Sequence, residues 1–263
     1  MLHPRRWQRE VLAECAHFGI HPKQCASVLS ERLIQRMERE FAECDKIVVP
    51  STAARQSFEG LRDAGKATVV WPGVNHDFFT PPPDSRRPPL FRVCYVGRLE
   101  LAKGLGYLLQ SWHKLALPDA ELVLIGEYRT ELKSLLERYD GANVRLTNIL
   151  SPQEVAQWYR ESSLFVFPSV NEGFGMVLLE AMASGLTVIA SEKTGADDCV
   201  THGHDGFIVP ARNVDALAET ILWCYQHPDD AQSIGKAARA TIEAQFTLAH
   251  YDRRIISLYR SVS

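Results

Sequence analysis

Two glutamates and two glycines stand close together in residues 171–183, and their spacing suits the binding of an anion. Glu172 and Glu180 are separated by seven residues, and Gly173 and Gly175 lie between them, followed by an apolar run that is typical of a helix. The wholly apolar segment LFVFP, typical of a buried strand, comes just before. The order strand, glycine-rich turn and helix presents unpaired backbone N–H groups at the positive end of a helix dipole. We therefore expect a phosphate here, with Glu180 in reach of whatever is attached to it.

A second group of candidate residues lies in VGRLELAKG, residues 96–104, at the end of another apolar strand pattern. Gly97 allows a tight exit from the strand, and Arg98 and Lys103 place two cations on one short loop. Open α/β sheets bind ligands outside the carboxyl ends of their strands, and two cations near a helix start suit a diphosphate. The alternative, two solvated surface charges, is less favoured by this position. Neither G-x-G-x-x-G nor G-K-[ST] follows the strand, so we expect no nicotinamide or flavin cofactor and no Walker loop.

The two glutamates also have an ordinary structural interpretation. Glu172 would merely favour a helix N-terminus, and Glu180 would be a surface residue of the helix. However, Glu180 stands among Leu178, Leu179 and Met182, and an unpaired carboxylate in such apolar surroundings would be costly. The sequence therefore favours the functional interpretation.

Strand and helix patterns alternate regularly after residue 90. The strand patterns are apolar without alternation, which predicts strands buried on both faces of a parallel sheet with helices on both sides. We therefore predict an α/β fold, a Rossmann-like doubly wound parallel sheet, over residues 91–263. Its six expected strands are FRVCYVG, ELVLIG, NVRLT, LFVFP, TVIAS and GFIVP, and its expected helices include residues 105–117, 131–139, 196–200 and 214–225.

The first eighty residues hold too few strands for a second domain of the same kind. Residues 5–43 have helical periodicity with a break near Pro22, and two short strand patterns flank a helix that Ser51 would cap and that would run to about Leu61. Residues 80–90 contain five prolines, which predicts an extended linker. We expect residues 1–80 to form an incomplete N-terminal domain and residues 81–90 to be the linker.

The bulk composition excludes several classes. A net charge of −3 gives no reason to expect a nucleic acid partner, and the six cysteines contain no C-x-x-C pair. No apolar stretch has the length of a membrane span, and the first residues lack the apolar core of a signal peptide, so we expect a cytoplasmic protein without membrane contact. No Asp-x-Asp pair occurs where a metal would be needed, and HGHDG is more typical of a polar turn, so no metal site is expected.

The block EGFGMVLLE, followed by AMASG, resembles the E-x7-E signature of the retaining glycosyltransferases of family 4, which have the GT-B fold. GRLELAKG, LVLIGE, FVFPS and DGFIVP look like further blocks of that family in the same order, as do CDKIVVPS and WPGVNHDFFTP before the linker. The resemblance covers nearly the whole chain from about residue 28. It implies a metal-independent enzyme without a cofactor, which transfers a sugar from a nucleotide diphosphate sugar to a carbohydrate or other acceptor.

The resemblance also implies a role for each matching residue. Arg98 and Lys103 would bind the diphosphate and stabilise it as a leaving group, Glu172 would hold hydroxyls of the donor sugar, and Glu180 would accept hydrogen bonds from the ribose. The backbone at the helix start would bind phosphate, and the loop 148–150 would face the base. The implied catalytic residues are Arg98, Lys103 and Glu172, and the implied donor-binding residues are Gly97, Ile149, Gly173, Phe174, Gly175, Met176, Val177 and Glu180.

The chain departs from the family in its first part. Family members have two Rossmann-like domains that face each other across a cleft, and here the first, acceptor-binding domain is represented only by about residues 1–80. Three explanations stay open: a truncated gene product, one half of a split enzyme with a partner chain, or a donor-binding module without transfer activity. The alternative function is therefore a non-catalytic nucleotide-sugar-binding or assembly subunit. A Rossmann-like protein that binds some other phosphate ligand is a third possibility.

Overall fold

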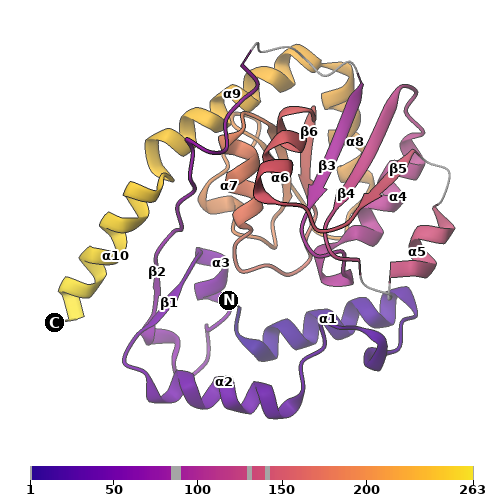
Figure 1. Ribbon diagram of the computed structural model, residues 1–263. Helices are drawn as coiled ribbons and strands as arrows, with labels where there is room; N and C mark the ends of the chain where they lie inside the picture. Colours follow the sequence, from indigo (N-terminus) through magenta and orange to yellow (C-terminus); the bar gives the residue numbers. More distant parts are fainter. Residues whose placement is uncertain (1, 84–89, 129–131, 140–142, 263) are drawn as a thin grey trace.

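Six short apolar segments form one parallel sheet in the order β5-β4-β3-β6-β7-β8 (Figure 1). The computed structural model describes residues 2–83, 90–128, 132–139 and 143–262. The register is regular, since Phe91 to Val96 pair residue by residue with Ala120 to Ile125. The strands are β3 Phe91–Val96, β4 Ala120–Ile125, β5 Val144–Thr147, β6 Leu164–Phe167, β7 Thr187–Ser191 and β8 Phe207–Val209.

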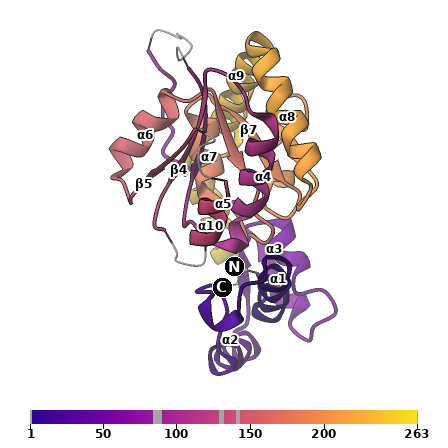
Figure 2. The same ribbon diagram turned by 90° about the vertical axis from the view of Figure 1, so that its right-hand side faces the viewer.

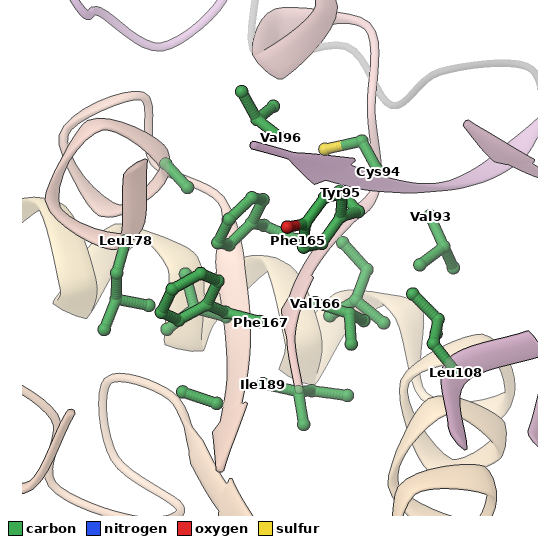
Figure 3. Close-up of a cluster of buried hydrophobic side chains, with 14 of the residues drawn as sticks. Val93, Cys94, Tyr95, Val96, Leu108, Phe165, Val166, Phe167, Leu178 and Ile189 are labelled. Atoms are coloured by element: carbon green, nitrogen blue, oxygen red, sulfur yellow. The ribbon is translucent and has the colours of Figure 1, made fainter. Parts of the chain in front are cut away.

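The sheet is covered on both faces, as its apolar strands require. All four residues of β6 and all five of β7 are buried. Figure 3 shows Phe167 of β6 directed toward Leu178 of α7, whereas Val166 lies on the side of Leu108 of α4. The covering helices are α4 Leu105–Leu115, α5 Lys133–Arg138, α6 Pro152–Arg160, α7 Met176–Ala183, α8 Val214–Gln226 and α9 Pro228–Gln245.

The strand order reverses its direction between β3 and β6. From β3 the chain moves by way of α4 to β4 and then to β5, whereas from β6 it moves by way of α7 to β7 and then to β8. The two crossover helices therefore lie on opposite faces, because parallel crossovers are right-handed. At such a switch point the loops after the two neighbouring strands diverge and leave a crevice at the carboxyl edge of the sheet.

The N-terminal part of the chain lies against this carboxyl edge (Figure 1). It contains only two paired strands among its described residues, β1 and β2, and they are parallel. Helix α1 packs against the short helix η3 Leu101–Lys103, which follows β3. The elements are α1 Pro4–Phe18, η1 Pro22–Gln24, α2 Glu31–Glu43, β1 Ile47–Val49, α3 Thr52–Gln56, η2 Ala64–Lys66 and β2 Ala67–Val69.

The C-terminal helix α10 Leu248–Val262 runs back toward the N-terminal part, as both views show (Figures 1 and 2). Val74 N–H donates to the carbonyl of Phe246 at 2.8 Å. The guanidinium of Arg254 stacks over the ring of Trp71 at 5.2 Å from its centroid. On α1, Glu14 accepts from Arg212 Nε at 2.6 Å. These contacts fix the N-terminal part on the six-stranded sheet at two separate places.

The structure confirms the α/β fold and the six expected strands, and it corrects several helix boundaries. Helix α3 ends at Gln56, not near Leu61, because the chain then turns and reaches Gly60 with a φ of 77°. The break between α1 and α2 is longer than Pro22 alone suggests, since Gly19 already ends α1 in the left-handed conformation. The expected helix near residue 196 is a single 3-10 turn, η5 Ala196–Asp198.

Two expectations fall partly on residues that the structure does not describe. The helix expected over residues 131–139 is seen from Lys133, and residue 131 lies outside the described residues. Of the expected linker 81–90, residues 84–89 lie outside them as well. Within the described parts of the chain, no helix combines the length and the apolar character that crossing a bilayer requires.

Candidate functional site

The loops that follow β3 and β6 touch each other at the switch point. Gly97 leaves β3 with a φ of 147°, and a Cβ atom there would lie 2.8 Å from the hydroxyl of Tyr95. Gly104 ends η3 with a φ of 69°, and a Cβ atom there would lie 2.0 Å from the carbonyl oxygen of Pro168, which follows β6. Ser169 Oγ also donates to the carbonyl of Ala102 at 3.0 Å. Glycine at position 104 therefore lets the two loops approach closely, whereas Gly97 makes room for the ring of Tyr95.

This approach brings two of the predicted site residues into contact. Lys103 Nζ donates a hydrogen bond to Glu172 Oε2, and the two side chains form an ion pair. The pair is largely buried, since only 12% of the Lys103 side chain and 18% of the Glu172 side chain are exposed. The other oxygen, Glu172 Oε1, accepts from the N–H of Gly173 at 3.0 Å. The Glu172 N–H donates to the carbonyl of Lys193 at 3.0 Å. Both carboxylate oxygens are thus occupied, and the charge of Lys103 is neutralised within the chain.

The second cation, Arg98, is more accessible. Its side chain is 56% exposed, and its Nη2 lies 3.5 Å from Glu100 Oε1. Glu100 is buried, with 1% of its surface exposed, and its Oε2 accepts from the hydroxyl of Ser27 at 2.8 Å. Tyr95 beneath the loop donates to the carbonyl of Arg98 at 3.0 Å, and burial together with the nearby Glu172 and Glu100 carboxylates raises the pKa of its hydroxyl. Arg98 is therefore the cation of this loop that is free to reorient.

The start of α7 lies next to the Lys103–Glu172 pair and carries no side-chain cap. Gly175 is the N-cap residue, and a Cβ atom there would lie 2.3 Å from the ring of Phe167. Phe174 is buried, and a Cβ atom on Gly195 would lie 2.4 Å from its ring. Because the first N–H groups of a helix have no partner within it, the N–H groups of Phe174, Gly175, Met176 and Val177 present a positive helix end at this point.

Glu180 has different surroundings from Glu172. Its Oε2 accepts from the hydroxyl of Tyr159 at 3.3 Å, and the same hydroxyl lies 3.3 Å from the carbonyl of Val177. Burial raises the pKa of Glu180, and the hydrogen bond from Tyr159 opposes that shift. Glu180 therefore accepts its hydrogen bond from a neutral hydroxyl, and it lies just over one helical turn after the first residue of α7.

A cavity of about 840 Å³ separates the carboxyl edge of the sheet from the N-terminal part. Of the predicted site residues, it brings together Arg98, Lys103, Glu172 and Gly173, with Glu100 beside them. The opposite wall is mostly apolar and belongs to the N-terminal part: Trp7, Leu29, Leu33, Met37, Phe41 and Val49. A polar floor and an apolar wall are typical of ligand sites.

Other predicted residues lie outside this cavity. Glu180 and Gly97 do not line it, and Ile149, which follows β5, is 71% exposed. Met176 is 41% exposed and lines a separate cavity between β1, β2 and α10. Another cavity of about 310 Å³ lies at the opposite edge of the sheet, beside Phe91 and Thr187 at the starts of β3 and β7, and none of the predicted residues lines it.

Sequence reasoning missed the contacts that fix the N-terminal part to this site. Ser51 was predicted as a helix cap, which it is, since it accepts from Ala54 N–H at 2.9 Å. Its hydroxyl also donates to the carbonyl of Gly173. The N–H of Thr52 donates to Asp198 Oδ2 at 2.6 Å. No local pattern marks Asp198 or Glu100, because their partners are distant in sequence. Among the described residues, no group of three or more metal-ligating side chains was found.

Residues 84–241 match the family model of the glycosyl transferases group 1, so the chain belongs to this family. Its fold matches that of GT-B glycosyltransferases, including the sucrose-phosphate synthase from Thermosynechococcus elongatus, with a TM-score of 0.78 and 27% identity over 89% of this chain and 64% of that one. HepE from Anabaena, solved in complex with UDP-glucose, gives a TM-score of 0.77 with 21% identity over 88% and 68% of the two chains.

Among proteins of known activity, alpha-maltose-1-phosphate synthase of Mycolicibacterium smegmatis is 31% identical over 65% of this chain and 48% of its own length. The chain spans about half the length of the curated relatives that it matches.

Proposed function

We propose that the cavity at the carboxyl edge binds a nucleotide diphosphate sugar and that the chain transfers the sugar to an acceptor with retention of configuration. The observation that carries this proposal is the contact between Lys103 and Glu172, which come from the two loops at the switch point. Arg98 and the start of α7 lie beside them. The paired cation Lys103, the accessible cation Arg98 and the start of α7 thus lie together at the carboxyl edge of the sheet, where α/β proteins bind phosphates.

The Lys103–Glu172 ion pair would open when a diphosphate binds. A diphosphate oxygen is a stronger partner for Lys103 than a carboxylate already shared with Gly173 N–H, because it also meets the helix end. The diphosphate would displace Glu172 from Lys103, and Glu172 would then accept a hydroxyl of the donor sugar. As the bond to the sugar breaks, Arg98 and Lys103 would stabilise the charge that develops on the diphosphate, and no metal would be needed.

The nucleoside would extend toward Glu180. Tyr159 occupies one oxygen of that carboxylate, and the other would accept a ribose hydroxyl. The exposed loop that holds Ile149 would face the base through its backbone. The UDP-glucose bound by HepE supports a nucleotide sugar as the class of donor.

Binding calorimetry on the double variant Arg98→Ala/Lys103→Ala tests the proposal. We expect the wild-type chain to bind at least one of UDP, GDP and ADP, and the double variant to lose that binding by roughly a hundredfold or more, since two charge-assisted contacts are removed. Lys114→Ala is the matched control, because Lys114 pairs with Asp215 on the outer surface of α4. Unchanged affinity of the double variant would refute the site.

A non-catalytic or assembly subunit that needs a partner chain is the second candidate. It is favoured by the apolar wall of the cavity, which belongs to the N-terminal part. Incubating the chain alone with the nucleotide sugar that binds best, and following the anomeric signals by NMR, separates the two. Release of sugar with retained configuration, undiminished by EDTA, supports the enzyme, whereas tight binding without any release supports the subunit.

A further inference from the structure

Glu100 is a buried carboxylate that the proposed mechanism does not use. Only 1% of the residue is exposed, and Oε2 accepts from the hydroxyl of Ser27. Its other oxygen, Oε1, is buried and has no hydrogen-bond partner within the described parts of the chain. The closest cation is Arg98, whose Nη2 at 3.5 Å is too far for a good hydrogen bond.

Leaving such an oxygen without a donor is costly, because a buried charged acceptor loses its water without gaining a protein partner. Glu100 lines the same cavity as Lys103 and Glu172. An acceptor that lacks a donor therefore stands in the wall of the site where a ligand rich in hydroxyl groups is proposed to bind.

Arg98 decides when this oxygen becomes available. Its side chain lies beside Oε1 without a hydrogen bond and is more than half exposed, so little holds it in place. If Arg98 turns toward a diphosphate, as proposed above, Oε1 would lose its nearest cation and become open to a new donor. Ser27 keeps the other oxygen occupied, so the carboxylate can accept one further donor in a fixed direction.

We propose that Glu100, positioned by Ser27, is a second hydroxyl-binding carboxylate of this cavity and accepts a hydrogen bond from a sugar hydroxyl. The inference rests on the proposed function, since it needs a sugar in the same cavity. The hydroxyl belongs either to the sugar of the nucleotide donor or to a sugar that acts as acceptor. Glu100 and Glu172 would then both hold hydroxyl groups in this cavity.

The test compares Glu100→Gln, which keeps the shape and removes the charge, with Asp205→Asn. Asp205 is the control, because its carboxylate is also buried, accepts hydrogen bonds from Thr201 N–H and the hydroxyl of Thr241, and lies outside the cavity. Each variant is titrated with UDP, GDP and ADP, with their glucose or mannose esters, and with maltose or methyl glucoside in the presence of saturating nucleotide.

We expect Glu100→Gln to bind the free nucleotide within about twofold of wild type and to lose roughly tenfold or more in affinity for one sugar-bearing probe. Loss for the nucleotide sugar assigns the hydroxyl to the donor, and loss only for maltose or methyl glucoside assigns it to the acceptor. Asp205→Asn should match the wild type throughout. If Glu100→Gln does not fold, Glu100→Asp, which keeps the charge and withdraws the oxygen by one methylene, should show the same selective loss.

Two results overturn this inference while leaving the proposed function intact. The first is a Glu100 variant that matches wild type in every titration. The second is an equal loss for free nucleotide and for every sugar-bearing probe, which would make Glu100 only a positioning residue for Arg98. A wild-type chain that binds no nucleotide and no nucleotide sugar would instead refute the proposed function itself, and the hydroxyl site with it.

Discussion

Glu172 and Glu180 belong to one sequence motif, yet the fold gives them opposite surroundings. Glu172 pairs with the cation Lys103 in the wall of a large cavity. Glu180 is held by the neutral hydroxyl of Tyr159, lies outside that cavity, and has a pKa that burial raises. The difference teaches that the spacing of the motif places both residues near one helix start, whereas their chemistry is decided by side chains from other segments.

The largest effect should come from replacing each glutamate by glutamine and comparing ligands. Glu172→Gln should bind free nucleotide as well as wild type or better, because Lys103 is released, and should lose roughly tenfold or more for the nucleotide sugar. Glu180→Gln should lose roughly tenfold in affinity for both ligands, because both contain ribose. Neither variant should lose affinity for inorganic pyrophosphate, which contains neither ribose nor a donor sugar. Calorimetry with the three ligands distinguishes the patterns, and identical patterns would end the distinction between the two residues.

Gly175 lies between the two glutamates at the start of α7, and Gly175→Ala should destabilise the fold by about 1–3 kcal/mol. The new Cβ would lie 2.3 Å from the buried ring of Phe167, so either the ring or the start of α7 must move. Urea denaturation measures the change in the free energy of unfolding. Gly65→Ala is the control, since nothing lies within 4 Å of its Cβ position, and an equal loss in both variants would contradict the packing argument.

Tyr159→Phe should cost about 1 kcal/mol of stability, because it removes the hydroxyl that serves Glu180 and the carbonyl of Val177. It should also raise the pKa of Glu180 further, since this hydrogen bond favours the charged carboxylate. The pair Lys103–Glu172 does not involve Tyr159, so affinity for pyrophosphate should stay at the wild-type level. A parallel loss of pyrophosphate binding would show that the two regions are coupled.

The smallest effect should be the pH dependence that Glu180 contributes. Because burial raises its pKa in the folded state, the ionised carboxylate costs stability at neutral pH. That cost disappears as the pH falls through the raised pKa toward the pKa of the unfolded chain. Glu180→Gln should therefore stabilise the fold by less than about 1 kcal/mol at pH 7, and the gain should vanish in acid. A gain that grows as the pH falls would have the wrong sign; Glu59→Gln, at the surface, is the control.

The strands and the order of the elements were predictable from sequence because most strands of the sheet are short apolar runs bounded by turn residues. The edge strand β5 is an exception to the expected burial, since Arg145 and Leu146 are exposed. Caps were predictable for the same reason: Ser51, Ser151 and Asn213 each accept a hydrogen bond from an N–H group three residues later. The end of α3 was not, because it depends on where the chain turns to pair β2 with β1.

The candidate site was predictable to the level of its two loops. Arg98, Lys103, Glu172 and the start of α7 follow from strand ends and glycine spacing. The ion pair between Lys103 and Glu172 was not, because it depends on the approach of the loop after β6 to that after β3, which Gly104 permits. Glu100 was missed because its partner Ser27 is seventy-three residues away in sequence.

A crystal structure of the chain with the nucleoside diphosphate that binds best would test the central claim most directly. The account predicts that the diphosphate lies between Lys103 and the N–H groups of residues 174–177, with Arg98 turned toward it and Glu172 displaced from Lys103. A diphosphate bound elsewhere, such as in the cavity at the amino edge of the sheet, with the Lys103–Glu172 pair intact, would contradict it.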